Sequence, residues 1–183
     1  MRETEIVPYV SLFRGINVGG HHKIRMDDLK KVHEDLGLRD VVSYIQSGNV
    51  VFKSNAIDIE EIRIQIKESV ARTFGFSVEV MIRTAGELRE IIAKNPFAGR
   101  PDKESKWIAV FFLAAHPSDA AQEDLLKSYT GPEEIFILGQ EAHIYYPDGM
   151  GRSKLNNSLL EKKLKTAGTA RNWNTVLQLQ TLM

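Results

Sequence analysis

The chain has 183 residues, no cysteine, and 24 basic residues against 24 acidic ones, so its formal net charge is zero. This composition excludes a disulfide framework, a thiolate zinc site, an iron–sulfur cluster and a cysteine nucleophile. The first residues lack the apolar segment of a signal peptide, and no stretch approaches the length of a membrane span, so we expect a cytoplasmic protein.

Hydrophobic periodicity and turn residues predict alternating strands and helices in the first half of the chain. In chain order they predict a strand over 6–13, a loop over 14–25, a helix over 27–36, strands over 41–46 and 50–53, a helix over 58–74 and a strand over 77–83. The segment Ser47-Gly48-Asn49 marks a tight hairpin. The order βαββαβ is that of a ferredoxin-like unit.

The second half repeats this pattern without a residue-level repeat. A capping box from Thr84 to Glu87 starts a helix, and a polar loop over 95–104 is the candidate boundary. Next come a strand over 106–113, a helix over 118–128, strands over 135–138 and 142–146, a helix over 154–164 and a short helix over 174–182. We therefore predict an α+β fold with two ferredoxin-like (βαββαβ-type) subdomains and antiparallel sheets. The first covers residues 1–95 with a linking helix, and the second, βαββα with C-terminal helices, covers 96–183.

Polar residues gather in two loops of the first half. In a βαββαβ unit, the loop after the first strand and the hairpin between the second and third strands lie at one end of the sheet. The candidate ligand-binding residues there are Arg14, Asn17, Gly19, Gly20, Lys23, Gln46, Ser47 and Asn49. Neither the P-loop pattern nor the dinucleotide GxGxxG pattern fits, which leaves a generic anion pocket or glycines that only shape a long turn.

The C-terminal segment is basic. Residues 151–183 contain six basic residues and one acidic residue, so they carry a net charge of +5. Two polar segments, 149–156 and 169–174, precede predicted helices, with Ser153 and Asn174 as natural N-caps. The candidates there are Arg152, Ser153, Lys154, Asn156, Arg171, Asn172 and Asn174. These cations could bind a phosphate or carboxylate together with the first-half loops, or they could pair with acids of the chain itself.

The remaining polar residues favour structural roles. The five histidines show no metal-ligand spacing, and we expect no metal and no cofactor. We predict that His33 faces solvent on its helix and that Trp173 belongs to the core. Ser47 is a turn residue before it is a nucleophile, and catalytic residues stay unknown.

Four motifs together resemble one known family. They are LFRGINVGG at 12–20, YIQSGNVVF at 44–52, GRSKLN at 151–156 and TARNWN at 169–174. They are similar to those of a bacterial family of unknown function whose members are uncharacterised conserved proteins. The resemblance covers nearly the whole chain and implies two ferredoxin-like subdomains in a cytoplasmic protein, with no activity and no catalytic residues to transfer. One departure is His21-His22, where similar proteins tend to carry lysine or another polar residue.

The sequence leaves several functions open. The first hypothesis is that the polar loops bind a small anionic, phosphorylated ligand. The alternatives are a structural or protein-interaction role in which the motifs lock the subdomains together, an enzyme acting on a small anionic metabolite, and RNA binding. The neutral net charge makes nucleic acid the weaker partner, no membrane partner is expected, and the oligomeric state is unknown.

Overall fold

The chain divides into two units in its computed structural model, which describes residues 6–55 and 58–183. Unit 1 comprises the residues up to Arg89 together with Leu179–Met183, and unit 2 comprises Glu90–Gln178. The division between Arg89 and Glu90 falls within the helix Ala85–Ala93, and the boundary predicted from the sequence, after residue 95, lies just beyond the end of that helix.

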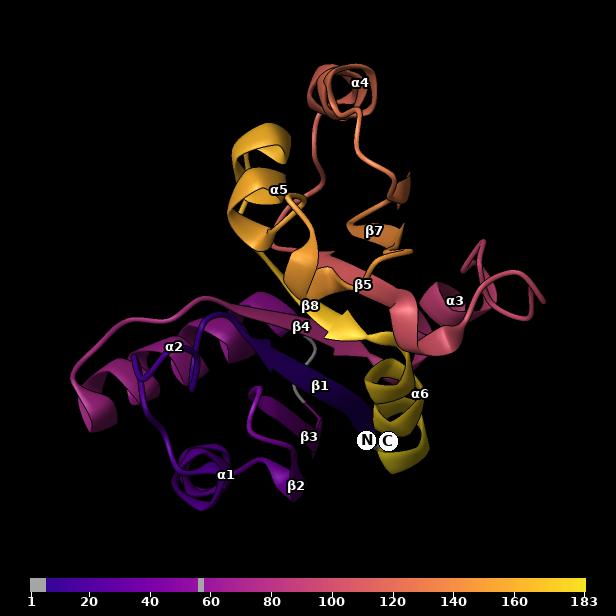
Figure 1. The fold of residues 1–183 in the computed structure, drawn as a ribbon. Coiled ribbons are helices and arrows are strands. Elements are labelled where there is room, and N and C mark those ends of the chain that lie inside the picture. Colours follow the sequence, from indigo (N-terminus) through magenta and orange to yellow (C-terminus); the bar gives the residue numbers. More distant parts are fainter. Residues whose placement is uncertain (1–5, 56–57) are drawn as a thin grey trace. The chain divides into compact units, whose positions relative to one another are not determined.

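Unit 1 is a four-stranded antiparallel sheet with helices on one face (Figure 1). The strand order β2-β3-β1-β4 is the ferredoxin-like order. Its elements are β1 (Val7–Phe13), α1 (Met26–Asp35), β2 (Arg39–Tyr44), β3 (Asn49–Ser54), α2 (Ile59–Phe74), β4 (Val80–Thr84) and α3 (Ala85–Ala93). The predicted order of elements is therefore confirmed for this half.

The core of unit 1 lies between the sheet and helices α1 and α2. Leu29 of α1 and Ile66 of α2 are fully buried against Phe13 and Phe52 of the sheet. The apolar residues of each helix recur every three or four positions, so they form one stripe that the sheet covers. This packing fixes the end of β1, from which the long loop departs.

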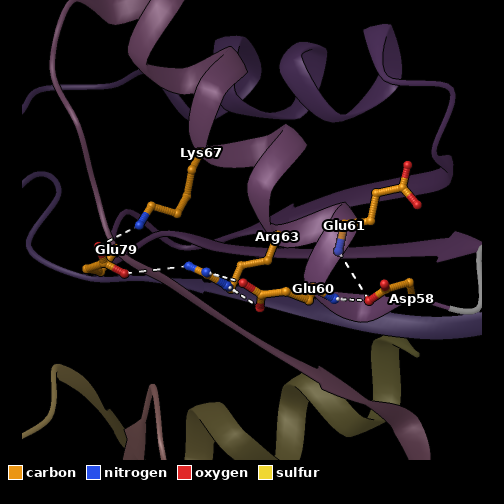
Figure 2. Close-up of polar contacts among 6 residues, drawn as sticks. All are labelled: Asp58, Glu60, Glu61, Arg63, Lys67 and Glu79. Carbon is orange, nitrogen blue, oxygen red and sulfur yellow. Dashed lines mark hydrogen bonds and ion pairs between the residues drawn. The ribbon is translucent and has the colours of Figure 1, made fainter.

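Helix α2 is capped and then tied to the start of β4 (Figure 2). Asp58 accepts hydrogen bonds from the backbone N–H groups of Glu60, at 2.9 Å, and Glu61, at 3.3 Å. Lys67 donates to the carboxylate of Glu79 at 2.6 Å, and Arg63 lies 3.7 Å from the same carboxylate. The capping oxygen satisfies N–H groups that the helix itself leaves unpaired.

His33 corrects one sequence-based expectation. It is fully buried in α1 and does not face solvent. Its Nδ1 lies 2.8 Å from the carbonyl oxygen of Leu29, so this nitrogen donates, and its Nε2, 3.1 Å from Ser11 Oγ, accepts from the hydroxyl. A polar side chain on the apolar stripe is tolerated because both ring nitrogens have partners.

Unit 2 repeats the same plan with strand order β6-β7-β5-β8. Its elements are a 3-10 turn (Ser105–Trp107), β5 (Ile108–Leu113), α4 (Asp119–Ser128), β6 (Glu134–Leu138), β7 (Glu141–Tyr145), a 3-10 turn (Met150–Arg152), α5 (Asn157–Leu164), β8 (Gly168–Asn172) and the first part of α6 (Trp173–Leu182), up to Gln178. Leu125 of α4 and Leu160 of α5 are fully buried with Phe111 and Ile144 of the sheet. The predicted fold of two ferredoxin-like subdomains is confirmed.

Three local predictions in unit 2 need correction. Residues 169–172 form most of β8, although their sequence predicted a polar segment before a helix. Helix α5 begins at Asn157 with Asn156 as its cap, so Lys154 lies before the helix and Ser153 is not the N-cap. The side chain that caps the start of α6 is that of Asn172 and not that of Asn174, because Asn172 Oδ1 accepts a hydrogen bond from the backbone N–H of Asn174 at 3.0 Å.

The two units share the same hydrogen bonds at the end of the first strand. Phe13 N–H donates to the Gly48 carbonyl at 2.9 Å, and in unit 2 Leu113 N–H donates to Gln140 at 2.9 Å. What differs is the chain that follows. Residues 14–25 connect β1 to α1, whereas only 114–118 connect β5 to α4; unit 2 has its long connection at 146–156, between β7 and α5. Each unit thus carries one extended polar connection.

Within the described residues, none of the helices has both the length and the apolar character needed to cross a membrane.

Candidate functional site

The loop after β1 and the β2–β3 hairpin meet at one end of the unit 1 sheet, as the topology predicted. The loop begins where Arg14 N–H donates to the Glu79 carbonyl at 2.9 Å, next to the Phe13–Gly48 bond. It is therefore anchored on both sides by neighbouring strands. Glu79 is in turn held through its side chain by α2 (Figure 2).

Asn17 fastens the loop to the hairpin. Its Oδ1 accepts from Ile24 N–H at 2.8 Å, and its Nδ2 donates to the carbonyl of Ile24 at 3.0 Å and to that of Gln46 at 2.9 Å. Asn17 has φ 56°, in the left-handed region that asparagine tolerates better than most residues. One amide side chain thus closes the loop upon itself and joins it to the neighbouring turn.

The glycines of this loop shape its outer turn. Gly19 and Gly20 both have positive φ, and they form the turn in which His21 N–H donates to the Val18 carbonyl at 3.0 Å. Neither glycine lines the pocket at the base of this loop. The turn explains why glycine stands at these two positions, since glycine adopts positive φ without strain.

A pocket of about 410 Å³ lies between the base of the loop, the start of α1 and the hairpin, and we call it the unit 1 pocket. Its lining residues are Asn17, Lys23, Ile24, Arg25, Met26, Asp27 and Gln46. Three of them, Asn17, Lys23 and Gln46, were predicted from the sequence. Arg25 and Asp27 were missed, although their place at the start of α1, directly after the loop, was the available signal.

The charged side chains of the unit 1 pocket are not neutralised by the protein. Lys23, Arg25 and Asp27 are exposed, and among residues 6–55 and 58–183 none of them forms an ion pair. Arg63 and Lys67, on the same unit, both engage Glu79 (Figure 2). The charges of the pocket therefore remain available to a ligand.

The start of α1 also differs from that of the other helices with assigned caps. Arg25 is its N-cap residue and provides no side-chain hydrogen bond, whereas Asp58, Ser118 and Asn156 cap α2, α4 and α5. The pocket thus borders a helix N-terminus whose first backbone N–H groups donate no hydrogen bond to a capping side chain.

The other unit 1 candidates lie outside the pocket. Asn49 is fully buried, and its Nδ2 donates to the Tyr44 carbonyl and to Ser47 Oγ, both at 3.0 Å, so it stabilises the hairpin. Ser47 is thereby held in the same turn. Arg14 is exposed at the end of β1 and does not line the pocket.

A second pocket, which we call the unit 2 pocket, has a volume of about 430 Å³. Three candidates line it, Arg152, Ser153 and Lys154, together with Tyr129, Glu133 and Asp148. The hydroxyls of Tyr129 and Ser153 both donate to the Glu133 carboxylate, and Ser153 Oγ accepts from Leu155 N–H at 2.9 Å. This cluster joins the α4–β6 connection to the β7–α5 connection.

The electrostatics of this cluster do not suit base catalysis. Burial raises the pKa of Glu133, but the hydrogen bonds from Ser153 and Tyr129 outweigh it and hold the pKa below its ordinary value. Burial and the bond to Glu133 raise the pKa of Tyr129 to about 12. A carboxylate with a lowered pKa is a weaker base than an ordinary one, and here it accepts hydrogen bonds from both hydroxyls.

The remaining C-terminal candidates make bonds within unit 2. Asn156 Oδ1 accepts from Leu159 N–H at 2.9 Å, and Asn172 Nδ2 donates to the Lys106 carbonyl at 2.8 Å. Arg171 is buried in β8, where its Nη1 donates to Thr169 Oγ1 at 2.7 Å and to the Ala170 carbonyl at 2.9 Å. Burial lowers the pKa of Arg171 to about 10. Asn174 is exposed in the first turn of α6.

Comparison with known families decides the classification. Residues 6–143 match the family model described as "Protein of unknown function (DUF1697)". The chain belongs to this family. For this DUF1697 member, the resemblance inferred from the sequence motifs is therefore confirmed at the level of a family of unknown function.

A solved structure confirms the fold of this DUF1697 chain. It is described as "The structure of conserved bacterial protein SP0830 from Streptococcus pneumoniae", with a TM-score of 0.71 and 21% sequence identity. The similarity covers 97% of this chain and 99% of that one. A comparison with curated proteins gave no match. At this identity the likeness speaks to fold alone.

In the described part of this DUF1697 chain, no group of three or more histidine, aspartate or glutamate side chains is placed to hold a metal ion.

The expectation that polar segments of both units bind one ligand together stays a prediction.

Proposed function

We propose that this protein binds a small, phosphorylated anionic ligand in the unit 1 pocket. The observation that carries the proposal is the presence of two cations, Lys23 and Arg25, that have no ion pair within the described residues and line a pocket of about 410 Å³. That volume lies within the range of small-molecule sites, roughly 300–1,000 Å³.

The side chains of the pocket suit a phosphate group. A guanidinium offers paired N–H donors that match phosphate oxygens, and an ammonium adds a compact positive charge. Gln46 adds an amide that can orient the rest of the ligand. Asn17 acts as a positioning residue, because its side-chain hydrogen bonds are made to the loop and the hairpin.

Hydrogen bonds within the protein hold the backbone that lines the pocket. Asn17 bonds to Ile24 and Gln46, and several residues of the loop adopt left-handed conformations. A site that is already ordered loses less conformational entropy on binding. The ordered backbone around Lys23 therefore supports a binding role for this loop, whereas its glycines explain only how it turns.

The test is thermal unfolding with a panel of nucleotides, sugar phosphates, carboxylates and short RNAs at low and high salt. A ligand at 100 times its dissociation constant stabilises by about 2.7 kcal/mol, or roughly 5–10 °C for a chain of this size. We expect one small phosphate to give such a shift, and the double variant Lys23→Ala/Arg25→Ala to abolish it.

Arg72→Ala is the matched control. Arg72 is an exposed cation on α2 that donates a hydrogen bond to Ser69, and it lies outside the pocket. Its loss should leave the ligand shift unchanged. No shift with any phosphate, or an equal loss in the control, would contradict the proposal. A shift with RNA that vanishes at high salt would instead favour nucleic-acid binding, because phosphate contacts release counterions.

A structural role is the second candidate for part of the motifs. Asn49, Asn156 and Asn172 use their side chains for hydrogen bonds inside their own unit, and Arg171 is buried. These bonds account for the four residues just named without a ligand, but they involve neither Lys23 and Arg25 of the unit 1 pocket nor Arg152 and Lys154 of the unit 2 pocket. The cytoplasmic location expected from the sequence belongs to this proposal and is testable by cell fractionation.

A further inference from the structure

Asp27 lines the unit 1 pocket together with Lys23 and Arg25, yet forms no ion pair with either in the described structure. A pocket built for a bare anion has no use for a carboxylate. The negative charges of Asp27 and of an anionic ligand repel each other. The presence of Asp27 therefore constrains which anion the pocket accepts.

A carboxylate offers only hydrogen-bond acceptors. A ligand that satisfies Asp27 must carry donors close to its phosphate. The Gln46 amide in the same pocket offers both a donor and an acceptor, and within the described residues the hydrogen bond of its side chain is with Asn17 Nδ2, at 3.5 Å. Hydroxyl groups both donate and accept, so they fit the carboxylate and the amide at once, whereas an ammonium group fits only the acceptors.

We infer that the ligand is a sugar phosphate, in which a phosphate lies beside free hydroxyl groups. This inference rests on the proposed function and specifies its substrate class. The phosphate contacts Lys23 and Arg25, and hydroxyls of the sugar donate to Asp27 and bond to Gln46. The same chemistry occurs in a free sugar phosphate and in the ribose phosphate of a nucleotide.

Asp28 provides the internal comparison. Both Asp27 and Asp28 lie in the first turn of α1, where a carboxylate interacts favourably with the helix dipole. Only Asp27 lines the pocket. If both aspartates act only on the helix, their substitution should have the same effect on ligand binding. If Asp27 contacts ligand hydroxyls, only its substitution should weaken binding.

The experiment measures binding of four probes by isothermal titration calorimetry at low salt. The probes are ribose 5-phosphate, adenosine monophosphate, phosphoethanolamine and inorganic phosphate. They are titrated into the wild-type protein, Asp27→Asn, Asp28→Asn and Lys23→Ala/Arg25→Ala. The unfolding temperature of each variant, measured without ligand, establishes that it is folded.

We expect Asp27→Asn to weaken binding of ribose 5-phosphate by about tenfold, since a hydrogen bond to a charged group is lost. The same change should tighten binding of inorganic phosphate by about two- to fivefold, because a repulsive charge is removed. Asp28→Asn should change neither. If adenosine monophosphate binds as tightly as ribose 5-phosphate, the site is assigned to nucleotides. If adenosine monophosphate does not bind, the site is assigned to free sugar phosphates.

The inference is overturned if Asp27→Asn tightens all four probes alike, or if phosphoethanolamine binds better than ribose 5-phosphate. In either case the phosphate site at Lys23 and Arg25 stands. If no probe binds the wild-type protein, or if the lysine–arginine double variant binds as well as wild type, the proposed function fails together with the inference.

Discussion

Asn17 shows how much of the site depends on a single side chain. It holds a left-handed backbone conformation and bonds to both the loop and the hairpin. The sequence marked it as a polar loop residue and therefore as a ligand candidate. Only the structure shows that its hydrogen-bonding groups are engaged by Ile24 and Gln46, so that it positions the pocket.

We expect Asn17→Ala to lower the free energy of unfolding by about 2 kcal/mol, since it removes partly exposed hydrogen bonds and places a Cβ-bearing residue at positive φ. Asn17→Gly keeps the backbone preference and should cost about half as much. Urea denaturation measures both. Equal effects of the two substitutions would show that the left-handed conformation contributes nothing.

Two buried histidines couple stability to pH. Burial lowers the pKa of His33 to about 4, despite its bond to Leu29, and burial lowers that of His143 to about 4 as well. His143 lies in β7, and its Nδ1 has no hydrogen-bond partner within the described structure. Neither burial was evident from the sequence, because the burial of a side chain depends on which other elements pack against it.

Both folded-state pKa values lie below the unfolded value of about 6.5, so the neutral forms stabilise the fold. We expect stability to be fully present above pH 6.5 and to fall as the pH drops toward 4, by up to about 1.4 kcal/mol per pH unit for each histidine. Chemical denaturation from pH 7 to 5 avoids the range in which most carboxylates of the unfolded chain titrate. His143→Leu should reduce the slope over that range, and an unchanged slope would contradict the assignment.

At the scale of elements, the β2–β3 hairpin packs directly beneath the loop. Gly48 has φ 81°, and a Cβ there would lie 2.6 Å from Ile16 Cδ1 and 2.9 Å from Phe13 Cβ. From the sequence, the positive φ of the tight turn was the only reason found for a glycine at this position. The structure adds a second requirement, because the buried Ile16 occupies the space that a side chain would need.

We expect Gly48→Ala to lower the free energy of unfolding by about 2–4 kcal/mol through backbone strain and overpacking. Gly20→Ala is the matched control, since Gly20 also has positive φ but a Cβ added there would meet no atom within 4 Å. It should cost about 1 kcal/mol, from the backbone alone. Thermal or urea unfolding separates the two, and similar losses would mean that the contact with Ile16 is readily relieved.

For the whole molecule, the repeated plan distinguishes structural motif residues from candidate binding residues. Arg83 of β4 lies opposite Val10, and Arg171 of β8 lies opposite Val110; each is buried and donates to the carbonyl of the preceding residue at 2.9 Å. Two equivalent arginines in the last strands of two sheets indicate a shared structural role. The long polar connections, by contrast, differ between the units.

Strand β8 completes the sheet of unit 2 by pairing with β5 from Ala109 to Leu113. A chain ending at Thr166 lacks β8 and α6, and it leaves one edge of the fully apolar β5 without its partner. We expect this truncation to abolish cooperative unfolding of unit 2 and to remove hydrogen-exchange protection from β5. Retention of native protection in β5 would show that β8 is dispensable.

The sequence by itself determined the order of elements in the first half of the chain, the antiparallel fold class and the meeting of the first loop with the hairpin. These follow from periodicity, glycine placement and the rules of the βαββαβ unit, all of which are local or topological. Tertiary structure alone decided that residues 169–172 form a strand, that His33 and Arg171 are buried, and that Arg25 and Asp27 join Lys23 in one pocket. The physical reason is that burial and pairing depend on partners distant in the chain, such as Ser11 for His33 and β5 for β8, whose identity no local pattern records.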